Sequence, residues 1–303
     1  MLAGCGKEEE AGATKLDQKN DKLIVYTTIY PLYDFAQKIG GEFIQVHQII
    51  PPGSEAHHFE PSAKLLATLS QADILIFNGA DMEPWITKVK GALEKSQLHF
   101  VNSSQNVTLL KTIEEQSHEN EDHHENHAVD PHIWLSPFNA KLQCQAICDA
   151  FVEKDYVHAG YYKENYGQLV EQLNQLDAEY RHALGKYTKK ELVVSHNSFG
   201  YLARDYGLIQ IPIRGLAAEA EPTPGKIKEI IALAKEHDIR YIFYESLIDP
   251  KVSRVIAEEA GLKTLELNPL GNLSLKELER GEDYFSVMRA NLANLKIALN
   301  NAS

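Results

Sequence analysis

Short apolar runs alternate with longer amphipathic stretches along most of this 303-residue chain. The short runs are rich in β-branched and aromatic residues, whereas the longer stretches repeat their apolar residues with a helical period. Such alternation is typical of βαβ units, whose parallel strands form a sheet that is flanked by helices. The expected strands lie at 23–27, 43–49, 74–77 and 98–101 in the first half, and at 192–195, 208–213, 241–244 and 263–267 in the second.

The two halves of the chain repeat the same scheme. The expected helices lie at 32–39, 62–70 and 84–93 in the first half, and at 199–206, 224–237, 250–260 and 282–299 in the second. Two of the strand segments, 72–78 and 240–245, resemble each other, and a proline follows each of them before the next helix. This similarity favours two similar α/β lobes, each with a mostly parallel sheet flanked by helices, over one long sheet.

A continuous helical pattern separates the two halves. No strand-like run interrupts residues 137–184, and residues 159–184 keep the apolar spacing of a single helix. A helix of that length spans about 39 Å at roughly 1.5 Å per residue, so it would join the lobes rigidly. We therefore expect an N-terminal lobe at 21–136, a connecting helical segment at 137–186 and a C-terminal lobe at 187–303.

The charge and the first residues of the chain bear on its partners. The 30 basic and 43 acidic residues give a net charge of −13, which argues against a nucleic-acid partner. No apolar run reaches about 18 residues, the length that suggests a membrane span. The stretch Leu-Ala-Gly-Cys that ends at Cys5 resembles a bacterial lipobox at the end of a secretory signal peptide. Cys5 is therefore expected to carry a lipid anchor and residues 1–20 to form a flexible tether; the alternative is an arbitrary start with one free cysteine.

Three histidines follow expected strands in distinctive local contexts. His57 lies after the second strand in Gly-Ser-Glu-Ala-His-His-Phe-Glu-Pro-Ser, His132 lies after the fourth in Asp-Pro-His-Ile-Trp, and His196 follows the first strand of the second lobe. Ligands of open α/β sheets bind beyond the carboxyl ends of the strands, so we expect the three side chains to meet. Neutral imidazole is a preferred ligand of zinc and copper, and this convergence predicts a metal site in the cleft between the lobes.

Each of these histidines also has an ordinary structural explanation. His57 could be a loop residue like its neighbour His58, His132 could cap a turn beside Trp134, and His196 could hydrogen-bond within a strand–helix junction. The metal site is favoured because the three positions converge, and no single motif decides it.

A second group of histidines lies in an acidic segment of low complexity. Residues 114–126 read Glu-Glu-Gln-Ser-His-Glu-Asn-Glu-Asp-His-His-Glu-Asn and lack apolar periodicity, which predicts a surface loop at about 114–127. Four histidines are expected to make it an accessory zinc-binding loop: His118, His123, His124 and His127. The loop could gather zinc, sense the zinc load, or only keep the surface soluble.

Together these motifs resemble those of the metal-binding solute-receptor lipoproteins of bacterial ABC importers. The resemblance rests on the lipobox, His-x-Phe-Glu-Pro-Ser, Asp-Pro-His-Ile-Trp, Ser-His and Phe-Tyr-Glu-Ser, and it covers nearly the whole mature chain, including the long central helix. The acidic histidine-rich loop is similar to that of the zinc-specific branch. The resemblance implies that the ligands are His57, rather than His58, together with His132 and His196.

The resemblance also implies partners and a location. The partners would be a membrane permease of the ABC type and its ATPase, together with the membrane itself through the lipid anchor on Cys5. The location would be the bacterial cell surface, at the outer face of the cytoplasmic membrane, or the periplasm. A monomer is expected.

The fourth coordination position departs from the pattern of the resemblance. Many relatives have a carboxylate after Asn-Pro-Leu, where this chain has Gly271. We expect solvent to complete the site, with Glu55 or Glu245 as alternatives. Three imidazoles without a carboxylate suit Zn(II) better than manganese, which prefers oxygen ligands, although copper and nickel also bind imidazole.

Other functions share some of these features. Three histidines and a water also form the site of zinc-dependent hydrolases, but the chain lacks the His-Glu-x-x-His, Gly-x-Ser-x-Gly and phosphate-loop motifs. A surface adhesin or scaffold with structural zinc and a manganese-binding receptor of the same family are further alternatives. The expected function is that of an extracytoplasmic protein, not an enzyme, that captures Zn(II) with high affinity through three histidines and delivers it to an ABC importer.

Overall fold

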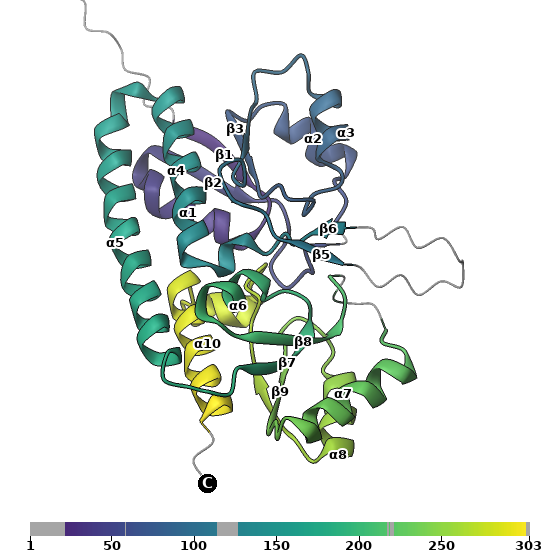
Figure 1. Ribbon diagram of the computed structural model, residues 1–303. Coiled ribbons are helices and arrows are strands. Elements are labelled where there is room, and N and C mark those ends of the chain that lie inside the picture. The colour runs from purple at the N-terminus through teal and green to yellow at the C-terminus, as the bar shows by residue number, and fades with distance from the viewer. Residues whose placement is uncertain (1–21, 58, 114–126, 217, 219–220, 301–303) are drawn as a thin grey trace, which may run out of the picture.

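Two parallel four-stranded sheets, one in each half of the chain, organise the computed structural model of this protein (Figure 1). The structure describes residues 22–57, 59–113, 127–216, 218 and 221–300. The first sheet has the strand order β2-β1-β3-β4 and the second has the order β10-β9-β7-β8, and the paired strands within each are parallel. The predicted class of two α/β lobes is confirmed.

The strands of the first sheet are β1 (Leu23–Thr27), β2 (Ile44–Gln48), β3 (Ile74–Phe77) and β4 (His99–Asn102), and those of the second are β7 (Glu191–His196), β8 (Ile209–Arg214), β9 (Tyr241–Tyr244) and β10 (Lys263–Glu266). The helices outside the connecting segment are α1 (Tyr30–Gly40), α2 (Ala63–Leu69), α3 (Ile86–Ala92), α6 (Gly200–Tyr206), α7 (Pro224–Glu236), α8 (Lys251–Ala260), α9 (Leu275–Glu279) and α10 (Tyr284–Leu299).

The observed elements follow the predicted ones, with ends that differ by a few residues. Helix α1 begins at Tyr30 rather than at residue 32, because Pro31 occupies its first turn, where a missing N–H costs nothing. Helix α10 begins after Asp283, whose side chain accepts a hydrogen bond from Ser286 N and caps the helix. Helix α9 was not predicted, because its five residues are too short to show a helical period.

A small antiparallel ribbon was not predicted either. Strands β5 (Lys111–Ile113) and β6 (His127–Val129) pair so that Ile113 lies opposite His127. The surface loop expected at about 114–127 lies outside the described residues, except for His127, whose main chain belongs to β6. Strands of three residues carry almost no alternation signal. The ribbon leads the chain directly to Asp130.

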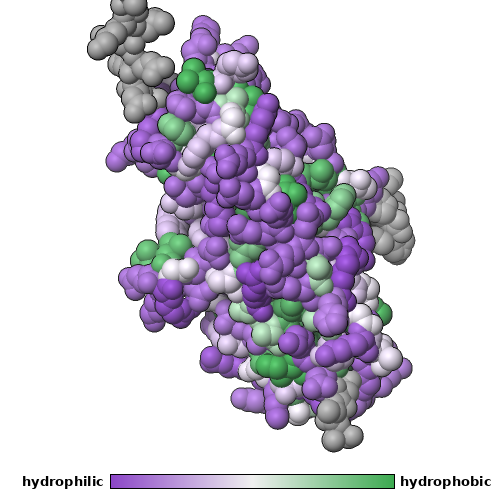
Figure 2. Space-filling model, turned by 90° about the vertical axis from the view of Figure 1, so that its left-hand side faces the viewer, coloured by the Kyte–Doolittle hydropathy of each residue, from purple (hydrophilic) through white to green (hydrophobic). Residues whose placement is uncertain are grey.

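Two consecutive helices, α4 (Pro137–Lys154) and α5 (Ala159–Leu184), connect the sheets, and α5 runs along the side of both lobes (Figure 1). The bounds of α5 are the predicted ones. One stripe of its side chains is buried where α5 packs against α1, α4 and α10: Tyr162, Leu169, Leu173, Leu176, Tyr180 and Leu184. The molecular surface on the side where α5 lies is mostly hydrophilic (Figure 2). None of the described helices is long and apolar enough to cross a membrane.

One apolar core continues from the first lobe into the second. The same cluster of buried side chains includes Phe35 of α1, Ile147 of α4, Leu173 of α5 and Leu295 of α10. Separating the lobes by a wide hinge motion would expose this shared surface to water, which is unfavourable. The fold therefore favours a rigid connection, as expected for the long helix, while the lobe boundaries at 136 and 186 stay a prediction.

The shared core gives a stability prediction for α5. Leu173 has no exposed surface, so Leu173→Ala should lower the free energy of unfolding by about 2–5 kcal/mol through lost burial and a residual cavity. Urea denaturation followed by far-UV circular dichroism measures the change. Gln172→Ala, at the exposed neighbouring position, should change it by about 0.5 kcal/mol or less. Equal effects of the two substitutions would contradict the packing described for α5.

Candidate metal centre

The three histidines singled out in the sequence come from three different parts of the fold. His57 follows β2 after a turn in which Ser54 N donates to Pro51 O at 3.1 Å, and Gly53 adopts a φ of 80°, which glycine tolerates. His132 lies between β6 and the short 3₁₀ helix Ile133–Leu135. His196 is the last residue of β7. His196 thus lies at the carboxyl end of β7, whereas His57 lies in the loop beyond the carboxyl end of β2, a strand of the other sheet.

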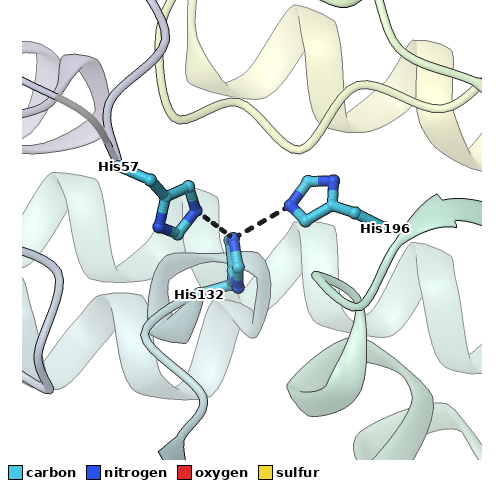
Figure 3. Close-up of side chains that lie close together, drawn as sticks. All are labelled: His57, His132 and His196. Atoms are coloured by element: carbon cyan, nitrogen blue, oxygen red, sulfur yellow. Dashed lines mark hydrogen bonds between the residues drawn. The ribbon is translucent and has the colours of Figure 1, made fainter. Parts of the chain in front are cut away.

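The imidazole rings of these histidines face one another (Figure 3). His132 Nε2 lies 3.1 Å from His57 Nε2 and 3.3 Å from His196 Nε2, and one ligand atom from each residue lies within 4.8 Å of the other two. Tetrahedral zinc with Zn–N bonds of about 2.0–2.1 Å places its nitrogen ligands roughly 3.3–3.4 Å apart. The two observed Nε2–Nε2 distances are therefore close to the ligand–ligand distance of a zinc coordination tetrahedron.

Carboxylates bind the outer nitrogens of two of the rings. Asp130 Oδ1 lies 2.9 Å from His132 Nδ1 and also accepts from the main-chain nitrogen of His132 at 2.9 Å. Glu245 Oε1 lies 2.6 Å from His196 Nδ1. A carboxylate at Nδ1 favours the tautomer with the proton on that nitrogen, so the Nε2 lone pair is free for a metal ion.

Burial controls the charge of this cluster. His132 and His196 are each 2% exposed, whereas His57 is partly buried. Burial lowers the pKa of His132 well below its ordinary value, and the neighbouring His57 and His196 lower it further. Burial also raises the pKa of Asp130 to about 7. The His132 ring is therefore neutral at neutral pH, as metal coordination requires.

A network of hydrogen bonds, which the sequence did not predict, fixes the turn that carries His132. Asn78 Nδ2 donates to Pro131 O at 2.9 Å, and Gln143 Nε2 donates to Asn78 Oδ1 at 3.1 Å. The buried carboxylate of Glu83 accepts from the main-chain nitrogen of Asn78 at 2.8 Å. These residues follow β3 or lie on α4, and no local motif links them to the site.

The cavity beside the rings bears on the fourth coordination position. It has a volume of about 40 Å³, and Glu55, Glu245 and Gly271 are among its lining residues. Glu245 approaches His196 from the side away from the other rings. Glu55 Oε1 lies 4.0 Å from His57 Nε2, and its other oxygen accepts from the main-chain nitrogen of His57 at 2.8 Å. Within the described residues, the cluster of potential ligands comprises the histidines alone.

Several predicted residues lie outside the described part of the chain. They are Cys5, His58, His118, His123 and His124. His127 is described only through its main chain in β6.

The chain matches a family of known proteins. The family model described as "Zinc-uptake complex component A periplasmic" matches residues 25–298. The chain belongs to this family. The match includes all three histidines of the cluster and both sheets.

Individual relatives agree with this membership. The chain is 36% identical to the high-affinity zinc uptake system protein ZnuA of Bacillus subtilis, over 99% of this chain and 94% of that protein. It is also 36% identical to the zinc-binding lipoprotein AdcA of Streptococcus pneumoniae, over 98% of this chain but only 58% of AdcA. The chain thus spans little more than half the length of AdcA.

A solved structure extends the comparison to the fold. The Zn(II)-bound ZnuA-like domain of Streptococcus pneumoniae AdcA superposes with a TM-score of 0.80 at 33% sequence identity. The alignment covers 93% of this chain and 100% of that domain. The two-lobed arrangement is therefore shared with a structure that holds zinc.

The carboxylate behind His196 gives a prediction for zinc affinity. Glu245→Gln removes the negative charge from the His196 Nδ1 contact, so zinc binding should weaken by roughly 10- to 100-fold. Competition with a chromophoric chelator measures the affinity. Glu259→Gln on the exposed face of α8 is the matched control and should leave it unchanged. A Glu245→Gln protein that binds zinc like the unaltered protein would contradict this role.

Proposed function

We propose that this protein is an extracytoplasmic receptor that captures Zn(II) through the Nε2 atoms of His57, His132 and His196 and delivers it to an ABC-type importer. The observation that carries the proposal is the convergence of three imidazole nitrogens, at 3.1 and 3.3 Å, in a chain of the zinc-uptake family. Neutral imidazole binds zinc and can also release it, which a transport receptor requires.

The donor set favours zinc over manganese. Manganese prefers oxygen-rich sites of higher coordination number, whereas the ligand cluster of the described residues consists of imidazoles. Solvent is the proposed fourth ligand. This assignment is supported by Gly271, which has no side-chain donor, and by Glu245, whose Oε1 contacts the outer nitrogen of His196.

Receptor function fits the site better than hydrolysis does. A zinc hydrolase needs a general base beside the metal-bound water. Glu245, the buried carboxylate that lines the cavity, already holds His196. The family itself is one of zinc-uptake components and not of enzymes.

The partners follow from the receptor function. The proposed partners are an ABC permease and its ATPase, which would receive zinc from the cleft between the lobes. The proposed location is the outer face of the cytoplasmic membrane or the periplasm, with Cys5 as the lipid attachment site. The AdcA relative is named a lipoprotein, which supports the anchor. We propose that the receptor acts as a monomer.

Removal of one imidazole tests the proposal. His196→Ala should lower zinc affinity by about tenfold or more, because the metal loses one of three protein ligands. Competition with a chromophoric chelator gives the affinity, and elemental analysis before and after chelation gives the metal and its stoichiometry. His237→Ala, at an exposed histidine on the far side of the C-terminal lobe, is the control. An unchanged zinc affinity in His196→Ala would refute the ligand assignment. Hydrolysis of esters or peptides that a chelator abolishes would instead favour a zinc-dependent hydrolase.

The histidine-rich segment is proposed as an accessory zinc-binding loop that contributes nothing to the main site. Because β5 and β6 bring its ends together, residues 114–126 can be replaced with Asn-Gly, a two-residue connection from Ile113 to His127 that favours a tight hairpin turn. The high-affinity site should stay within about twofold of its original affinity, since none of its three proposed ligands is removed. Weaker additional zinc binding should decrease in a calorimetric titration, because the replacement removes His118, His123 and His124 and leaves only His127 of the four histidines. Loss of the tight site would mean that the loop supplies a ligand.

A further inference from the structure

The segment that follows β10 crosses from the C-terminal lobe to loops of the N-terminal lobe. The main-chain oxygens of this cover segment, residues 267–274, accept three hydrogen bonds from the N-terminal lobe. Gly53 N donates to Leu273 O at 2.8 Å, Tyr30 N donates to Gly271 O at 3.2 Å, and Trp134 Nε1 donates to Pro269 O at 2.8 Å. The cover segment therefore lies over the metal site while it remains part of the C-terminal lobe.

Asn272 makes the most extensive side-chain contacts of the cover segment. It is 3% exposed, and its carboxamide nitrogen donates to Pro51 O at 2.6 Å and to Ser54 O at 2.9 Å. Its carboxamide oxygen accepts from Gln48 Nε2 at 2.8 Å and from the main-chain nitrogen of Leu273 at 2.9 Å. A carboxamide has two N–H donors and two acceptor lone pairs, so its full hydrogen-bonding capacity is used, mostly on residues 48–54.

The base of the cover segment is fixed in the C-terminal lobe by Asn268. Its main chain donates to Asn291 Oδ1 at 2.9 Å and accepts from Asn291 Nδ2 at 2.7 Å. Its carboxamide nitrogen donates to Glu277 Oε1 at 3.0 Å. Asn272 therefore links residues 48–54 to a segment whose position the C-terminal lobe determines.

We propose that Asn272 is a positioning residue that holds His57 in the metal site, and that breaking its contacts controls zinc dissociation. This rests on the proposed function, in which His57 is a ligand. Residues 51–54 directly precede Glu55 and His57, so a shift of this turn moves the imidazole. Gly271 has no side-chain donor, and the cover segment acts on His57 through Asn272 instead.

His57 is also the ligand best placed to leave first. It is only partly buried, whereas His132 and His196 are each 2% exposed. Loss of the three hydrogen bonds that the Asn272 side chain makes to Gln48, Pro51 and Ser54 would release the turn. The cover segment itself stays in place, because Leu267, Leu270 and Leu273 are buried in the shared apolar core.

Two substitutions at one position test the proposal. Asn272→Ala removes the contacts to residues 48–54 and should raise the zinc dissociation rate on the order of tenfold, the effect of losing one or two net hydrogen bonds. Asn272→Asp keeps the acceptors for Gln48 and Leu273 but places a carboxylate against the Pro51 and Ser54 carbonyls, so dissociation should be at least as fast. Stopped-flow mixing of the zinc-loaded protein with excess chelator measures the rate.

A double-substitution cycle with His57→Ala separates positioning from general destabilisation. If Asn272 acts through His57, Asn272→Ala should change zinc affinity in the unaltered background and have little effect in the His57→Ala background. The visible absorption of the cobalt-substituted protein should change in the same direction for Asn272→Ala and His57→Ala, because both alter imidazole coordination. Asn294→Ala is the control, since Asn294 Nδ2 donates to Glu266 O within the C-terminal lobe and should leave the rate unchanged.

The outcomes distinguish this proposal from the one on which it rests. Unchanged zinc affinity in His57→Ala would remove the proposed ligand, and the positioning role with it. Weakened binding in His57→Ala together with an unchanged dissociation rate in Asn272→Ala would overturn the positioning role alone. An Asn272→Ala effect of equal size in both backgrounds would also overturn it.

Discussion

Three imidazole rings face one another in a largely buried space, and the surrounding structure has to keep their Nε2 atoms turned inward. Asp130 and Glu245 do this from behind the rings of His132 and His196. Two buried carboxylates are costly to desolvate by themselves, but a divalent cation held by the rings would balance two negative charges. The bound cation would also lower the pKa of Asp130, which burial raises to about 7. Metal, rings and carboxylates would therefore stabilise one another.

The connection between the lobes sets the scale of motion that the site can use. Helix α5 shares one core with α1, α4 and α10, so a wide separation of the lobes would expose much apolar surface. Metal exchange is then expected to depend on loops at the cleft and not on the sheets. The residues around His57 suit this role, because they are held by hydrogen bonds to the cover segment and not by deep burial.

Much of the fold followed from the sequence because its signals are local. Strands such as 74–77 are short apolar runs, and the stripe of α5 repeats with a helical period, so both appeared at the expected positions. The meeting of His57, His132 and His196 could be predicted because parallel strands end at one edge of a sheet. The ribbon β5–β6 could not, since strands of three residues show no alternation.

The supporting residues escaped prediction for a different reason. Asn78, Glu83, Gln143 and Asn272 act through hydrogen bonds between segments far apart in the chain, and nothing in their neighbouring sequence marks them. Gly271 indicated only that a ligand was missing. The role of Asn272, which links the cover segment to the turn before His57, became visible only in the three-dimensional structure.

The direction of β1 has a consequence for how the receptor is oriented on a membrane. Its carboxyl end lies near the metal site, where the next residue, Thr28, donates to Glu83, so the chain enters the lobe at Leu23 from the opposite end. If Cys5 is the lipid attachment point and the Leu23 end of the lobe lies toward the bilayer, the metal site faces away from the membrane. The 18 residues from Cys5 to Leu23 can extend to roughly 60 Å, well beyond the length of α5, about 39 Å. With Cys5 as the anchor, a connection of that length would allow the receptor to turn over and present its cleft to a permease in the same membrane.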